Sequence, residues 1–365
     1  MIGYIGLAEF IPFFAFSFFT GHFADNFSRT KIARITILLL VLQASLLVFL
    51  SANNSSFLQT NGILPLYLTV VLWGIIRAFM SPALQALMPE IVPRNLYANA
   101  ATWNSTVWHI AAITGPTIGG ILCAYYDFNI VYSVVVSSIV IGFILFCFIT
   151  TRPAPENKKE ESIMKSFSTG LKFVFGKNLL LSALSLDLFA VLFGGATAML
   201  PAYADKILHV GATELGVLRA APAIGAVIVA IILAYFPPMK GAGKKLLFSV
   251  AAFGVCTIFF GISENYFLSF FLLALLGAFD NISVVIRHTI LQLMTPDNMR
   301  GRVGAVNGIF IGSSNELGAF ESGLAAGLMG LVPSVIFGGG MTLVIVIVIA
   351  ILSRQLRQLN MNNIR

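Results

Sequence analysis

Charged residues are scarce in this chain. Asp, Glu, Lys and Arg make up 10% of its 365 residues, whereas hydrophobic residues make up 58%. Soluble globular proteins carry about 25% charged residues. Such a sequence lacks the polar side chains that would cover a soluble domain, and its apolar residues fall in runs long enough to span a bilayer as helices. We therefore predict an all-α polytopic membrane protein.

Cysteines and catalytic motifs are scarce as well. Cys123, Cys147 and Cys256 each lie in an apolar run without CxxC spacing, so they indicate small buried residues rather than disulfides or metal ligands. The chain has no HExxH or GxSxG sequence, and no second histidine stands near His109. A lone histidine can relay protons, but it is more often a hydrogen-bonded packing residue. We expect no enzyme activity, no catalytic residue, no metal and no cofactor, and these absences disfavour a membrane-embedded enzyme.

The basic residues do not cluster as in a nucleic-acid-binding protein. The chain has 22 Lys and Arg residues against 15 Asp and Glu residues, and the basic ones are spread over the segments between apolar runs. Loops on the cytoplasmic side of a membrane carry an excess of Lys and Arg. The positive charge therefore indicates orientation rather than nucleic-acid binding. No basic segment or cleavage site precedes the first apolar run, so we expect no signal peptide.

Eleven apolar runs have the length of a transmembrane helix. They are residues 2–20, 32–51, 64–88, 100–124, 128–150, 179–203, 213–236, 246–263, 266–288, 303–326 and 333–353. When these runs alternate across the membrane, 18 of the 22 basic residues fall on the cytoplasmic side and only Lys206 falls outside. The C-terminus is therefore expected in the cytoplasm.

A polar linker divides the runs into five and six. We predict an N-terminal half at 1–151, a cytoplasmic linker at 152–178, a C-terminal half at 179–353 and a cytoplasmic tail at 354–365. Within the linker, apolar residues at helical spacing predict an amphipathic helix over 162–175 that lies on the inner membrane surface.

The two halves repeat each other. Gly6, Glu9 and Pro12 stand 210 positions before Gly216, Arg219 and Pro222, and Arg77 keeps the same offset from Arg287. Internal duplication is typical of secondary transporters, whose binding sites lie near the midplane between the repeats.

Several ionisable residues lie inside the apolar runs. Each costs about 2.5–3.5 kcal/mol at the centre of a spanning helix, so it requires a functional or structural reason. Asp280 and Arg287 are seven residues apart and share a helix face, so they can serve one cavity. The alternative is structural pairing between packed helices; Glu9 and Arg219, for example, can pair across the halves. The candidates for substrate binding or proton coupling are Asp187, Asp280, Arg287, Arg77, Glu321 and Glu9, where Glu321 continues a polar stripe through Asn307 and Ser314.

The turn after the first run resembles a known motif. Residues 21–31, GHFADNFSRTK, are similar to the signature loop Gly-x-Leu-Ala-Asp-Arg-x-Gly-Arg-Lys of the major facilitator superfamily, with matches at Gly21, Ala24, Asp25 and Arg29. The resemblance implies that Asp25 caps a helix and that Arg29 meets an acid at the end of the fourth helix, latching one conformation. Glu90 stands in the position of that acid.

Two further segments carry the resemblance. Gly115, Pro116, Gly119 and Gly120 resemble a fifth-helix Gly-Pro-x-x-Gly-Gly motif associated with exporters, and the glycines and proline would allow close packing and bending during gating. A plain packing face is the alternative. Residues 296–303, PDNMRGRV, are similar to a loop of the enterobactin-exporter-like branch of drug and siderophore efflux proteins.

The resemblance implies a function. It implies a two-half helical bundle, monomeric, in the cytoplasmic (inner) membrane of a bacterium, that exports a small amphipathic siderophore or drug-like molecule by proton antiport and alternating access. Lysophospholipid flipping is an alternative, as is a transport-inactive membrane sensor or truncated protein. The signature loop normally follows the second helix but here follows the first run, so we expect that the chain lacks its first transmembrane helix.

Overall fold

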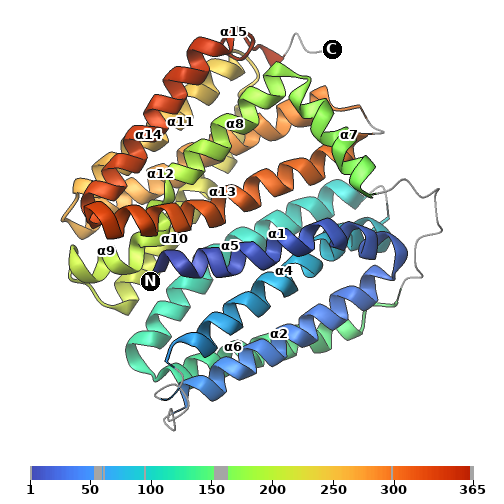
Figure 1. The fold of residues 1–365 in the computed structure, drawn as a ribbon, viewed down its shortest axis with the longest axis vertical. Helices are drawn as coiled ribbons and strands as arrows, with labels where there is room; N and C mark the ends of the chain where they lie inside the picture. The colour runs from blue at the N-terminus through green and yellow to red at the C-terminus, as the bar shows by residue number, and fades with distance from the viewer. Residues whose placement is uncertain are drawn as a thin grey trace. The chain divides into compact units, whose positions relative to one another are not determined.

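The computed structural model describes residues 2–52, 60, 62–93, 96–151, 163–296 and 299–361, and these residues contain helices and no strand. Figure 1 shows the helices in chain order. They are α1 (Ile2–Asn26), α2 (Arg29–Ser51), α4 (Leu64–Ile91), α5 (Tyr97–Tyr125), α6 (Phe128–Cys147), α7 (Ile163–Phe175), α8 (Asn178–Phe193), the short 3-10 helix η2 (Gly195–Met199), α9 (Leu200–Lys206), α10 (Ala212–Tyr235), α11 (Ala242–Ile262), α12 (Tyr266–Met294), α13 (Arg300–Met329), α14 (Leu331–Leu352) and α15 (Arg354–Arg357).

Each apolar run folds mainly as helix, which confirms the all-α prediction. Within the described residues, nine helical segments are long and apolar enough to cross a membrane. In α1 the apolar segment is shorter, Tyr4–Ser17, and α13 is not among the nine. The full count of eleven spans therefore stays a prediction. The turn expected at 21–31 is much shorter than predicted, because α1 continues to Asn26 and α2 begins at Arg29.

The chain forms two compact units. The N-terminal unit contains residues 5–108 and 121–164, and the C-terminal unit contains residues 165–365 together with 1–4 and 109–120. Within the first, α2 packs against α4 and α6; within the second, α11 packs against α12 and α14. This repeated arrangement agrees with the internal duplication read from the sequence.

Glycines set the close helix contacts inside each unit. In the N-terminal unit, a Cβ on Gly74 of α4 would lie 2.5 Å from the Glu9 carbonyl oxygen of α1. In the C-terminal unit, a Cβ on Gly277 of α12 would collide with the Pro222 backbone of α10. In each unit, therefore, a glycine lets two helices approach closely, α1 with α4 and α10 with α12, although the two glycines are not at matched positions of the repeat. Small residues at such contacts allow helix backbones to pack closely in lipid.

The segment at 179–203 is interrupted, which the sequence analysis missed. Helix α8 ends at Phe193, and the chain continues as η2 and α9. The break lies inside protein, since Met199 is 2% exposed and Leu200 is 1% exposed. Backbone carbonyls near the break face glycines: a Cβ on Gly318 of α13 would lie 2.8 Å from the Val191 oxygen. Irregular backbone is tolerated at membrane depth where surrounding protein covers it.

The linker helix α7 confirms the predicted helix but corrects its packing. Its apolar side does not simply face lipid, because Val174 is fully buried in a cluster with Leu184 of α8 and Val303 of α13. Gly170 permits this contact, since a Cβ there would lie 2.7 Å from the Arg302 carbonyl oxygen. The apolar stripe expected to face the inner leaflet therefore packs on the helices of the C-terminal unit. Residues 152–162 of the predicted linker lie outside the described residues.

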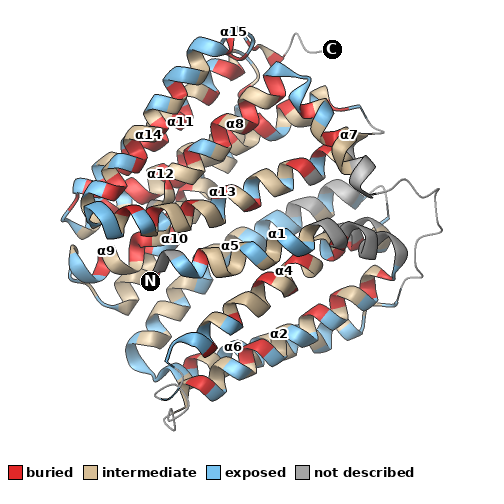
Figure 2. Cartoon of the chain, in the orientation of Figure 1, coloured by how far each residue is buried: buried red, intermediate tan, exposed pale blue. Residues whose placement is uncertain are grey.

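The C-terminal tail also packs on its unit. Leu356, Leu359 and Met361 are buried in one apolar cluster with residues of α8, α11 and α12. The Met361 N–H donates to the Met239 carbonyl at 3.1 Å, and the backbone of Leu356 lies directly against Gly243. The predicted tail at 354–365 is thus part of the folded core as far as residue 361. Figure 2 shows such buried positions lying along the helices, with exposed positions between them.

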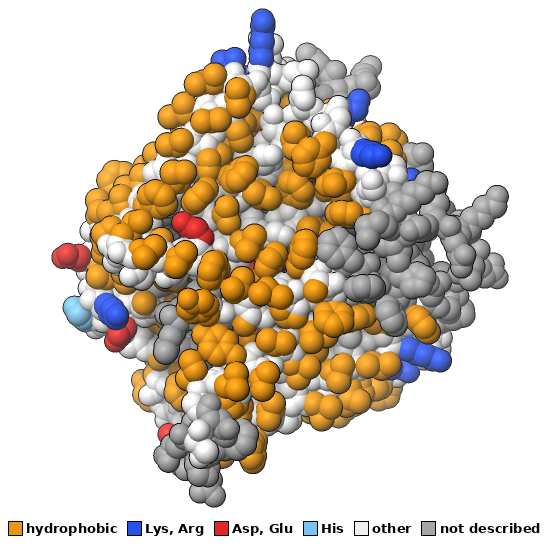
Figure 3. All heavy atoms as spheres, in the orientation of Figure 1, with side chains coloured by type: hydrophobic (Ala, Val, Ile, Leu, Met, Phe, Trp, Pro, Cys, Tyr) orange, Lys and Arg blue, Asp and Glu red, His pale blue; other side chains and the backbone are white. Residues whose placement is uncertain are grey.

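The outer surface is largely apolar. Figure 3 shows hydrophobic side chains over much of one face. Many large apolar side chains are exposed, including Phe148, Tyr235, Phe267 and Leu352. Soluble proteins rarely expose such wide apolar areas, so this surface fits contact with lipid chains.

Candidate functional site

Three helices of the C-terminal unit bring charged residues together. Asp187 lies on α8, and Asp280 and Arg287 lie on α12. Seven residues correspond to about two helical turns, so Asp280 and Arg287 occupy the same side of α12. Asn307, Ser314 and Asn315 come from α13. Helical periodicity therefore explains why the residues of α12 share one side of their helix and those of α13 share one side of theirs. Asp187 joins them because α8 packs nearby.

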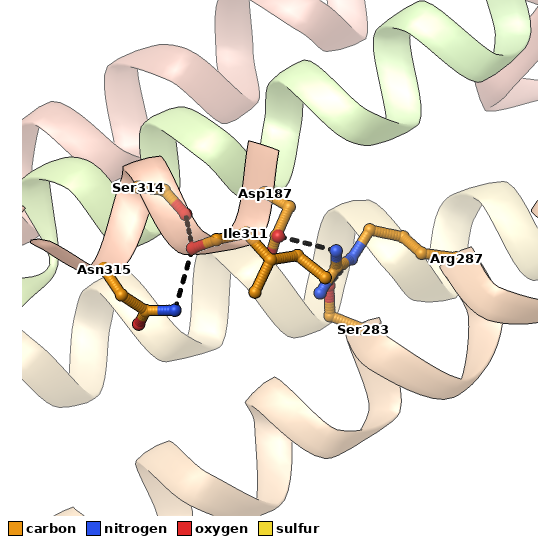
Figure 4. Close-up of polar contacts among 6 residues, drawn as sticks. All are labelled: Asp187, Ser283, Arg287, Ile311, Ser314 and Asn315. Atoms are coloured by element: carbon orange, nitrogen blue, oxygen red, sulfur yellow. Dashed lines mark hydrogen bonds and ion pairs between the residues drawn. The ribbon is translucent and has the colours of Figure 1, made fainter. Parts of the chain in front are cut away.

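Asp187 and Arg287 form a buried ion pair. Arg287 Nη1 lies 2.6 Å from Asp187 Oδ2, and the two side chains are 7% and 9% exposed. Arg287 Nε also donates to Ser283 Oγ at 3.2 Å, one turn earlier on α12. Figure 4 shows the guanidinium held between these two partners. Two partners from different helices fix the guanidinium, which keeps its charge under all ordinary conditions.

A cavity of about 140 Å³ opens beside this pair. Its lining includes both members of the pair and the half-buried Asp280, together with groups that can hydrogen-bond a ligand and apolar side chains. The remaining lining residues are Val191, Val284, His288, Leu291, Asn307, Ile311, Ser314 and Asn315. The structure thus brings Asp187, Asp280 and Arg287 to one cavity, and the sequence analysis had named all three as candidates for substrate binding or proton coupling.

The charges in this cavity do not balance when both carboxylates are ionised and the His288 imidazole is neutral. Arg287 compensates Asp187 directly. Among the residues that the structure describes, none forms a hydrogen bond or a close ion pair with the Asp280 carboxylate. The three groups then carry a net charge of −1, which is costly in a low-dielectric interior. A proton or another cation at Asp280 removes that cost.

Other polar groups shape the cavity. The Asn315 amide and the Ser314 hydroxyl both donate to the Ile311 carbonyl, at 2.9 and 3.0 Å (Figure 4). The sequence analysis missed Ser283, His288 and Asn315. Two of these residues could have been found from the sequence, because Ser283 stands one helical turn before Arg287 on α12 and His288 directly follows it.

Two residues considered from the sequence lie in the C-terminal unit but apart from this cavity. Glu321 lies on α13 but does not line it, although Asn307 and Ser314 of the same stripe do. His109 of α5 is half-buried and also lies outside the lining. Within the part of the chain that the structure describes, no cluster of three His, Cys, Asp or Glu side chains could hold a metal ion.

The N-terminal unit holds a second ion pair. Arg77 Nη1 of α4 lies 2.5 Å from Glu9 Oε1 of α1, and the Arg77 guanidinium carbon lies 5.2 Å from the centre of the Phe13 ring. Glu9 is thus paired within its own unit, and its pairing with Arg219 across the halves, considered as an alternative from the sequence, stays untested. The Glu9–Arg77 pair forms because Gly74 lets α1 and α4 approach closely at Glu9.

The latch residues lie at the ends of two helices. Arg29 Nη1 pairs with Glu90 Oε1 at 2.8 Å, joining the start of α2 to the end of α4. The resemblance had implied this contact, and its role in latching a conformation stays a prediction. The side chains of Gly21 and Asp25 lie outside the described residues.

The glycine motif of α5 makes one close contact. A Cβ on Gly120 would lie 2.5 Å from the Ala212 carbonyl and 2.8 Å from Gly216 Cα of α10, all within the C-terminal unit, and Pro116 contributes its carbonyl oxygen to the same contact. A Cβ on Gly115 or Gly119 would meet nothing within 4 Å. Gly120 thus serves close packing, while gating by the motif stays a prediction.

Comparison with known proteins agrees with this architecture. The family model described as Major Facilitator Superfamily matches residues 1–319. The enterobactin exporter EntS of Shigella boydii serotype 18 is 25% identical over 308 residues, which cover 84% of this chain and 72% of that protein. EntS of Escherichia coli O1:K1 is 24% identical over the same length.

Solved transporter structures share the fold. A bacterial homologue of the human lysosomal transporter Spinster, in an inward-facing and unoccupied conformation, aligns with a TM-score of 0.69 and 15% identity, covering 100% of this chain and 90% of that chain. A peptide transporter, POT, aligns with a TM-score of 0.72 and 10% identity, covering 98% and 87% of the two chains.

These observations define a multi-pass transporter of small molecules rather than an enzyme. The chain belongs to the major facilitator superfamily.

Proposed function

We propose that this protein exports a small amphipathic molecule across a bacterial cytoplasmic membrane in exchange for protons, by alternating access. The observation that carries the proposal is the uncompensated carboxylate of Asp280 beside the Asp187–Arg287 pair. The similarity to enterobactin exporters supports the direction of transport. The substrate, a siderophore or drug-like compound, would enter the cavity of the C-terminal unit.

Two carboxylates carry the coupling in this proposal. A proton on Asp280 removes the net negative charge of the cavity, and its release restores that charge. Asp187 can take part only when Arg287 changes partner, because their ion pair is closed in this structure. Conformational exchange between the two halves would then open Asp280 to one side of the membrane at a time. Arg77, Glu9 and Glu321 remain second-rank candidates for proton or substrate binding.

Purified protein in vesicles tests this function. A pH-sensitive dye inside the vesicles would report proton movement when siderophores, drugs or lysophospholipids are added. We expect Asp187→Asn and Asp280→Asn to abolish substrate-dependent proton movement while leaving the protein folded. Glu264→Gln, which removes an exposed carboxylate from the loop before α12, serves as the control.

Each outcome of this assay leads to a different conclusion. Normal coupling in both Asn variants would overturn the assignment and direct attention to Glu9 or Glu321. Movement of lysophospholipid alone, without protons, would support the flippase alternative instead. No transport of any compound by well-folded protein would favour a sensor.

The membrane topology is also a proposal. We propose five spans in residues 1–151 and six in residues 179–353, with the C-terminus in the cytoplasm, in a monomer. The match of α1 with α10 supports this count, since it leaves α8 without a counterpart among the described helices of the N-terminal unit. Green fluorescent protein fused to the C-terminus should fluoresce in cells, whereas the same fusion at the N-terminus should not. Fluorescence from both fusions would contradict an odd number of spans.

A further inference from the structure

We propose that the cavity between α8, α12 and α13 binds the positively charged group of its substrate at the Asp280 carboxylate, so that the substrate class is an amphipathic amine rather than an organic acid. The transport part of this inference rests on the proposed function. The binding part rests on the cavity itself.

The inference rests on which charged groups in the cavity are paired and which are not. Arg287 is already engaged by Asp187 and Ser283, through contacts of 2.6 and 3.2 Å. The single positive charge of the guanidinium is therefore already matched by one carboxylate, and what remains unmatched in the cavity is negative charge. Asp280 faces the same cavity, and none of the described side chains hydrogen-bonds or closely pairs with it. An anion would add a like charge beside two carboxylates, whereas an ammonium group would supply the missing compensation.

The walls and size of the cavity select an organic cation. Val191, Val284 and Leu291 provide apolar surface next to the carboxylate, while Asn307 and Asn315 provide amide groups that can orient a polar ligand. A volume of about 140 Å³ corresponds to roughly ten water positions at 10–15 Å³ each. This space exceeds the needs of a single inorganic ion and suits an ammonium group with a short aliphatic or aromatic part.

The inference gives the two aspartates different roles. Asp187 holds Arg287 and thereby sets the local charge, so it is a positioning residue. Asp280 contacts the substrate cation and is the group on which proton and substrate exclude each other. Competition at one carboxylate produces antiport without a second binding site.

The cavity charge can be measured directly with a reporter thiol. Asn315 is exposed and lines the cavity, so Asn315→Cys, made in a protein whose three native cysteines are replaced by Ala, places a thiol there. We expect 2-aminoethyl methanethiosulfonate to react about tenfold or more faster than 2-sulfonatoethyl methanethiosulfonate, relative to their rates with free cysteine. The ratio of the two rates cancels any change in thiol ionisation, because both reagents attack the same thiolate.

Variants decide whether Asp280 causes this preference. Adding Asp280→Asn should reduce the rate ratio to near one, whereas adding Glu264→Gln should leave it unchanged. A ratio near one in the presence of Asp280, or a ratio unaffected by Asp280→Asn, would overturn the inference.

A second measurement uses the unmodified protein, in case the cysteine variants do not fold. We expect 2-phenylethylammonium, but not 3-phenylpropanoate, to raise the unfolding temperature of the detergent-solubilised protein, because only the cation binds the native cavity. Sodium chloride at the same concentration controls for an inorganic cation. Stabilisation by 3-phenylpropanoate or by sodium alone would contradict an organic-cation site.

Vesicle assays separate failure of this inference from failure of the proposed function. Proton movement driven by amines supports both only if it is absent from protein-free vesicles and from vesicles with Asp280→Asn, because neutral amines also cross lipid unaided and take up protons inside. Proton movement driven only by acidic or neutral compounds overturns the cation site but keeps proton-coupled export. Cation-selective binding without any proton movement keeps the cation site and overturns proton coupling.

Discussion

The ion pair between α8 and α12 makes the sharpest stability prediction. Asp187→Asn removes one charge of a pair whose atoms lie 2.6 Å apart and whose side chains are less than one tenth exposed. With the charge centres about 4 Å apart and an effective dielectric constant of about 20, the direct attraction is about 4 kcal/mol. Removing one partner of a buried pair typically costs about 3–5 kcal/mol, because the other charge stays buried. Arg287 cannot lose its proton to avoid this cost.

A double-mutant cycle isolates the interaction. Arg287→Gln should also destabilise the protein, because it leaves two carboxylates in one cavity. The double variant should lie within about 2 kcal/mol of the wild type, since it buries neither charge of the pair. We therefore expect a coupling energy of at least about 2 kcal/mol between the two positions.

Thermal unfolding in detergent measures these differences. Each single variant should unfold on the order of 5 °C or more below the wild type, and the double variant should recover most of that loss. Glu264→Gln is the matched control, because it neutralises an exposed carboxylate. If the single variants unfold within 2 °C of the wild type, or if their effects simply add, the reasoning about the buried pair is wrong.

Three further predictions concern the docked tail, the Tyr203 hydroxyl and the Arg29–Glu90 pair. Gly243→Val should destabilise the protein by about 3 kcal/mol, because the valine side chain would collide with the docked C-terminal tail. Gly340→Ala should be neutral, since nothing lies within 4 Å of a Cβ at that position. Thermal unfolding compares the two variants. Tyr203→Phe should cost about 1–2 kcal/mol in the same assay, because the buried hydroxyl lies within hydrogen-bond distance of three backbone carbonyls, at 2.8, 2.9 and 3.1 Å; an unchanged melting temperature would contradict this. Arg29→Glu should slow transport severalfold, and combining it with Glu90→Arg should restore the rate if the 2.8 Å pair acts as a latch. Equal rates in the wild type, the single variant and the double variant would exclude that role.

Much of this fold follows from composition and periodicity. The apolar runs become helices because lipid leaves no other partner for the backbone polar groups. Asp280 and Arg287 could be assigned to one cavity from the sequence, because seven residues return a helix to the same face. The Arg29–Glu90 contact could be expected only through resemblance to the family.

Other features depend on which helix faces meet. Glu9 pairs with Arg77 because α1 and α4 approach at Gly74, and nothing in the spacing of Glu9 and Arg219 could reveal this. Helix α7 packs its apolar side on α8 and α13, although its amphipathic pattern would suit a membrane surface equally well. Likewise, Glu321 follows the stripe of Asn307 and Ser314 yet does not line the cavity.

By itself, the sequence determined that the chain is a helical membrane protein with internally repeated halves and a few costly intramembrane charges. These properties are local, because insertion into lipid depends on the residues within each helix. Only the tertiary structure decided which charges meet. Asp187 and Arg287 are 100 positions apart, and their contact depends on the rotation and packing of α8 and α12, which many glycine and apolar contacts fix together.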